Sequence, residues 1–72
     1  STTISYDLPI DSKVTLKVFD VLGREVATLV DGFARAGYHQ ATLNATNLAS
    51  GLYFYRIQAG SFMSVKKMVL VK

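Results

Sequence analysis

The sequence predicts an all-β fold, a small antiparallel β-sandwich of six to seven strands. Three observations support this prediction. Apolar and polar side chains alternate along most of the 72 residues. Turn-forming residues interrupt the alternation about every 8–12 residues, as in sandwiches. No segment of ten or more residues has the periodicity and caps of a helix. Because 50% of the residues are hydrophobic and only 18% are charged, the chain is globular and not disordered.

The first two strands are predicted from regular alternation. Residues 3–8 form the first, and Pro9 ends it because proline cannot donate a hydrogen bond to a sheet ladder. Residues 13–19 form the second, and residues 20–23 form a hairpin turn. We predict a positive φ angle for at least one of Gly23 and Gly51. Ile4, Tyr6 and Leu8 share one face of the first strand, and Val14, Leu16 and Val18 are expected to face inward from the second.

The segment from residue 24 to residue 37 is ambiguous. Read as a strand, residues 24–30 place Val26, Thr28 and Val30 on one face; read as a helix, they group Val26 with Leu29, Val30 and Phe33. The preceding turn favours the strand. Residues 31–37 are predicted to form a loop between Gly32 and Gly37. In that loop, Phe33 either covers an open end of the sandwich or is an exposed contact residue.

The second half of the chain contains the strongest strand signal. Residues 38–43 form a strand with Ala41 and Leu43 inward, and a polar loop follows whose Leu48 we expect to be buried. Aromatic and β-branched residues crowd into residues 52–58, which predicts a central strand. A turn at residues 59–61 leads to a last strand over residues 62–71, whose apolar end is either buried on both faces or an exposed edge. The inward face of the central strand is predicted to carry Tyr53, Tyr55 and Ile57.

The residues needed for catalysis or metal binding are scarce. There is no cysteine, His39 is the only histidine, and the nucleophile-elbow pattern Gly-x-Ser-x-Gly does not occur. The five acidic residues fall at predicted turns and strand ends, where Asp stabilises its own backbone. Asp7, Asp11 and Asp31 offer oxygen ligands but lack the spacing of an EF-hand. We therefore expect no catalytic residue, no cofactor and no metal, and we expect that the protein is not an enzyme.

The charge pattern bears on possible partners. The net charge is +3, which is too small for a polybasic nucleic-acid-binding arm. No segment approaches the about 18–20 apolar residues of a membrane-spanning helix, so we expect no membrane insertion. Tyr53, Phe54 and Tyr55 occur where a core is expected, which argues against a stacking platform for nucleic acid. A row of exposed aromatic residues on one sheet face would instead indicate a carbohydrate-binding or adhesive module of a secreted hydrolase.

Three blocks of the sequence, in order, resemble the type A C-terminal sorting domain of the bacterial type IX secretion system. The opening run of residues 3–9 is similar to the start of that domain. Residues 14–26 resemble its pattern V-x-L-x-V-[YF]-D-x-x-G-R-x-V, and residues 47–57 resemble L-x-S-G-x-Y-x-[YV]-R-[LI]. The last seven residues are similar to its terminal basic and hydrophobic motif. The resemblance implies an immunoglobulin-like sandwich in which Gly23, Arg24, Leu48, Gly51 and Tyr53 are structural motif residues.

The same resemblance implies a non-catalytic function. Such domains are folded sorting signals that follow the N-terminal cargo domains of a larger exported protein. Residues 1–72 are expected to be such a domain, excised from a larger secreted protein. The cargo enters the periplasm of a Gram-negative bacterium, the outer-membrane translocon recognises the domain, and a sortase-like cysteine protease removes it. The cargo is then secreted or attached to the cell surface. The candidate recognition residues are those of the terminal motif: Lys66, Lys67, Met68, Val69, Leu70, Val71 and Lys72.

Overall fold

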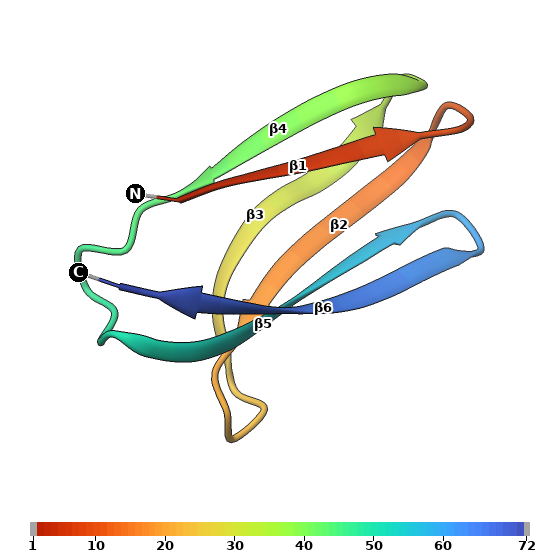
Figure 1. The fold of residues 1–72 in the computed structure, drawn as a ribbon. Helices are drawn as coiled ribbons and strands as arrows, with labels where there is room; N and C mark the ends of the chain where they lie inside the picture. The colour runs from red at the N-terminus through yellow and green to blue at the C-terminus, as the bar shows by residue number, and fades with distance from the viewer. Residues whose placement is uncertain (1, 72) are drawn as a thin grey trace.

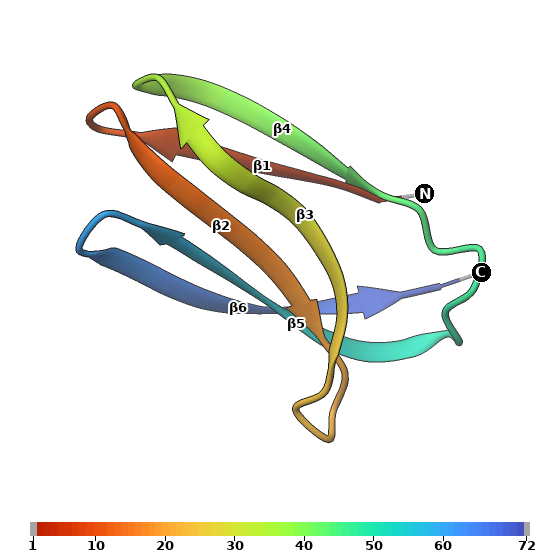
Figure 2. The ribbon, with the colours of Figure 1, turned by 180° about the vertical axis from the view of Figure 1, so that it is seen from behind.

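A computed structural model describes residues 2–71 and shows six antiparallel strands in two sheets. The predicted all-β sandwich is therefore confirmed. β1 (Thr2–Leu8) pairs with β4 (Gly37–Leu43) in a two-stranded sheet. β2 (Ser12–Phe19), β3 (Glu25–Ala34), β5 (Gly51–Ala59) and β6 (Phe62–Leu70) form the second sheet in the order β3-β2-β5-β6. Figures 1 and 2 show the β1–β4 pair lying over this larger sheet.

The core forms between the inner faces of the two sheets. One cluster joins Ile4, Leu8 and Ala41 of the small sheet to Val14 and Leu16 of the large one, together with Ile57 and Ala59. A second cluster contains Val18, Leu43, Ala45, Tyr53 and Leu70. Within residues 2–71 the structure has no helix long and apolar enough to cross a membrane. The residues predicted to face inward from β2 and β4 are buried, and so are those predicted to share one face of β1, except that Tyr6 is half-buried.

β2 and β5 are the two interior strands of the large sheet, so the prediction of a central strand over residues 52–58 is confirmed for β5, which pairs with β2 and β6. β2 is the second interior strand. It pairs with β3 on one edge and with β5 on the other. Val14, Leu16 and Val18 are fully inaccessible to solvent, because every second side chain of a strand points to the same face. The prediction for β5 is correct for Tyr53 and Ile57, whereas Tyr55 is only half-buried between the two clusters.

The predicted loop over residues 31–37 is wrong. β3 continues to Ala34, and Gly32 and Phe33 pair with Val14 and Lys13. Ladder hydrogen bonds to the buried strand β2 stabilise this segment despite the low strand propensity of glycine. Phe33 does not cover an end of the sandwich, since its exposed fraction is 72%; it lies on an edge strand in contact with solvent.

A register shift explains why a second prediction for β3 is wrong. Leu16 pairs with Val30, but the next residue, Lys17, pairs with Thr28, so Leu29 forms a bulge. Leu29 and Val30 both pack against the core, and Thr28 is exposed. The predicted common face of Val26, Thr28 and Val30 is therefore wrong. Alternation cannot reveal a bulge, because the extra residue moves the following side chains to the other face.

Candidate functional site

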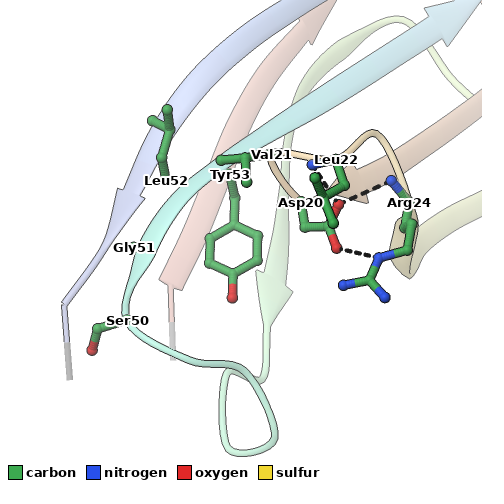
Figure 3. Close-up of a pocket in the computed structure, with 8 residues that line it drawn as sticks. All are labelled: Asp20, Val21, Leu22, Arg24, Ser50, Gly51, Leu52 and Tyr53. Carbon is green, nitrogen blue, oxygen red and sulfur yellow. Dashed lines mark hydrogen bonds and ion pairs between the residues drawn. The ribbon is translucent and has the colours of Figure 1, made fainter.

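Two separate sequence blocks meet at one pocket at the end of the large sheet. The pocket has a volume of about 280 Å³ and is lined by Asp20, Val21, Leu22 and Arg24 of the β2–β3 turn and by residues 50–53. Figure 3 shows the two groups on either side of the opening, with Tyr53 between them. Sequence reasoning missed this pocket. Only the pairing of β2 with β5 brings the two blocks together.

The Asp20 carboxylate organises the β2–β3 turn. Its Oδ1 accepts hydrogen bonds from the backbone N–H groups of Leu22 (2.9 Å) and Arg24 (3.0 Å), and its Oδ2 accepts one from Arg24 Nε (2.8 Å). These bonds, led by that from the Arg24 backbone, lower the pKa of Asp20. The predicted positive φ of Gly23 is confirmed at 82°, and its N–H donates to the carbonyl of Asp20 at 3.0 Å. Asp20 therefore holds the side chain of Arg24 at the pocket through the Nε atom alone.

The opposite wall is held by the motif residues of β5 and the preceding loop. The ring of Tyr53 is buried in the second cluster, and its hydroxyl donates to the carbonyl of Ala49 at 2.8 Å. Gly51 also has a positive φ, of 149°, so the prediction of a positive φ for at least one of Gly23 and Gly51 holds at both positions. Leu48 is half-buried against the same cluster and does not reach the full burial that the sequence predicts. These contacts fix where β5 begins.

The terminal motif lies on β6, an edge strand. β6 pairs with β5 alone, so its other edge has no strand partner in residues 2–71. Of the two expected outcomes for its apolar end, the exposed edge is correct: Leu70 is buried, Met68 is half-buried, and Val69 and Val71 are exposed. Lys72 falls outside the described residues.

The two adjacent lysines of β6 face opposite ways. Lys67 pairs with Phe54 on the outer face of the sheet, and Lys66 pairs with Tyr55 on the inner face. Lys66 lines a second hollow of about 180 Å³, which lies between β6, β5 and β1. Basic side chains thus flank the exposed edge of β6 on both faces.

Comparison with known families identifies the chain. The sequence model of the secretion system C-terminal sorting domain matches residues 1–72. The chain belongs to this family. No curated protein and no solved structure matches it. The sorting domain is a type IX secretion signal, so the protein that carries it is secreted or displayed at the cell surface and interacts with the type IX machinery.

His39 and Glu25 of the sorting domain have structural partners. The ring of His39 stacks on Tyr6 at 5.4 Å between centroids, and its Nε2 lies 2.6 Å from the carbonyl oxygen of Arg35. Glu25 bridges Lys17 at 3.1 Å, and this hydrogen bond is the main cause of its lowered pKa. No three His, Cys, Asp or Glu side chains among the described residues gather into a metal-binding group.

The exposed aromatic residues do not form a row. Phe33 lies on β3 and Phe62 on β6, at opposite edges of the large sheet, while Tyr38 lies on β4 of the small sheet. Phe33 pairs with Lys13 on the outer face, and Phe62 pairs with the buried Ala59. The exposed aromatic residues within residues 2–71 therefore give a sugar ring no continuous platform, and the comparisons give no evidence for the carbohydrate-binding alternative.

Proposed function

We propose that the domain is a non-catalytic sorting signal that the type IX outer-membrane translocon recognises directly, and that the translocon binds strand β6. In this proposal, residues 1–72 are the C-terminal domain of a larger secreted protein. The cargo crosses the periplasm of a Gram-negative bacterium with the sorting domain folded. A sortase-like cysteine protease then removes the domain. The observation that carries the proposal is the unpaired edge of β6.

An unpaired edge presents backbone N–H and C=O groups to any extended segment that can pair with it. In β6 that edge is not covered by another strand of residues 2–71, and its solvent-facing side chains include Val65, Lys67 and Val69. Main-chain hydrogen bonds would supply affinity, and the alternating side chains would supply specificity.

The charge of β6 favours an acidic partner. Lys66 and Lys67 are both exposed, and neither forms an ion pair with a described residue. Lysines on an edge strand oppose pairing with a second copy of the same chain, because like charges would meet. The same lysines attract a partner strand of opposite charge.

A reporter fusion tests the proposal. A periplasmic reporter with the domain at its C-terminus should cross the outer membrane of a type IX-competent cell, and the reporter alone should not. Replacing Lys66→Glu together with Lys67→Glu should sharply reduce export while the melting temperature stays near that of the parent. Retention of the intact fusion in the periplasm would contradict the proposal that the domain is a sorting signal. Undiminished export of the folded double variant would contradict the role of β6.

A further inference from the structure

The pocket at the end of the large sheet has features that folding alone does not require. We infer that it is a second docking element, which binds a short extended segment of the type IX machinery carrying a carboxylate next to an apolar side chain. The inference rests on the proposed function, since it assigns the segment to the same machinery. Three independent features of the pocket support it.

The first feature is an open sheet edge inside the pocket. β2 ends at Phe19, which pairs with Phe54, whereas β5 begins at Gly51. Residues 51–53 therefore extend beyond the end of β2. They pair with residues 68–70 of β6 on one side, but their other edge has no backbone partner within residues 2–71. An extended segment can enter where β2 leaves the sheet and continue its ladder.

The second feature is apolar. Val21 and Leu22 occupy the two central positions of the turn closed by the Gly23-to-Asp20 hydrogen bond, where short polar residues are more usual. Their exposed fractions are 61% and 75%, so they contribute little to the core. With Leu52, which is also exposed, they give the pocket aliphatic walls. Large apolar side chains gathered around a hollow indicate a binding surface.

The third feature is the guanidinium of Arg24. Asp20 engages its Nε, while the side chain remains 74% exposed. No second carboxylate within the described chain forms an ion pair with Arg24, and Figure 3 draws no interaction from its two terminal nitrogens to the other residues shown. Asp20 thus fixes the orientation of the guanidinium and leaves its remaining donors for an incoming acceptor. A planar guanidinium held in this way suits a carboxylate, which can accept two parallel hydrogen bonds.

Export of matched variants tests whether the pocket docks the machinery. Leu22→Ser and Arg24→Gln should each reduce reporter export. Ile10→Ser, at an exposed position of the β1–β2 turn, and Arg35→Gln, at an exposed position after β3, make the same chemical changes outside the pocket and should not. Melting temperatures identify any variant that fails to fold, and Arg24→Lys then replaces Arg24→Gln. Equal export of folded pocket and control variants overturns the inference. Failure of the intact fusion itself instead contradicts the proposed function.

Direct titration tests the chemistry of the ligand. The isotope-labelled domain is titrated with the peptide acetyl-Leu-Asp-Leu-amide and with its asparagine analogue, and amide chemical shifts are followed by NMR. We expect shifts at residues 20–24 and 51–53, with roughly tenfold weaker binding for the asparagine peptide and for the Arg24→Gln domain. Equal binding of the two peptides would overturn the carboxylate assignment. Shifts spread over both sheets, or no shifts at millimolar peptide, would overturn the pocket as a peptide site.

Discussion

Strands β2 and β6 belong to the same sheet and both carry lysines and valines, yet their surroundings differ. β2 has a strand on each edge, and the three aliphatic side chains of its inner face are inaccessible to solvent. β6 has one free edge, and among its residues Leu70 alone is fully buried. Position in the sheet, more than composition, therefore separates the residues that stabilise the domain from those available to a partner.

The largest effect expected from this comparison is on the core of β2. Leu16→Ala removes a fully buried side chain and leaves a cavity, so the free energy of unfolding should fall by about 2–5 kcal/mol. Val69→Ala on β6 removes an exposed side chain and should change it by less than about 0.5 kcal/mol. Urea denaturation of both variants measures the contrast. Similar losses would show that β6 is as essential to folding as β2.

Tyr53 lies where the core meets the pocket, and replacing it with alanine should destabilise the domain by a similar amount. Tyr53→Ala removes a buried ring and the hydrogen bond to Ala49, for an expected loss of about 3–5 kcal/mol. Tyr53→Phe keeps the ring and should lose only about 0.5–1.5 kcal/mol. Thermal melting distinguishes the two. A Tyr53→Ala domain as stable as the parent would contradict the assigned inner face of β5.

Two glycines allow a matched test of backbone strain. Gly51 has a φ of 149°, which side chains with a Cβ rarely adopt, although an added Cβ would contact nothing within 4 Å. Gly51→Ala should therefore destabilise the domain by about 1 kcal/mol or more through backbone conformation alone. Gly32 in β3 also has open space around it and no positive φ, so Gly32→Ala should be neutral or stabilising. Equal changes in melting temperature would contradict this explanation.

Most of the fold was predictable, because alternation in β1, β2, β4 and β5 directly reflects a sheet with one buried face. The errors have particular causes. The bulge at Leu29 and the strand residues around Gly32 depend on pairing with β2, which local propensity does not describe. Gly23, Gly51 and Tyr53 were indicated by the turn and strand patterns as well as by the resemblance, whereas Arg24 was found by resemblance alone. Their assembly around one pocket depends on where β2 ends relative to β5.

The smallest expected effect concerns pH. The hydrogen bond from the Arg24 backbone is the largest cause of the lowered pKa of Asp20, and the hydrogen bond from Lys17 is the largest cause of that of Glu25. A carboxyl group whose pKa is lower in the folded state contributes stability that is fully present above its unfolded pKa and is lost as pH falls through its folded pKa. The melting temperature should therefore decrease slightly on acidification into that range. The variant Asp20→Asn with Glu25→Gln should show a shallower decrease, and an identical pH profile would contradict these contributions.

The central claim is that interior strand β2 stabilises the domain and that edge strand β6 is recognised. The most direct test reverses the charge of two basic residues, either on β6 or at exposed positions elsewhere. Lys66→Glu with Lys67→Glu changes β6, and Lys13→Glu with Arg35→Glu makes the same change of net charge at exposed positions of β2 and the loop after β3. Reporter export is measured for both, at temperatures where circular dichroism shows each fusion to be folded. We predict that the β6 variant loses export and that the other variant retains it. Equal export of the two folded variants would contradict recognition through β6.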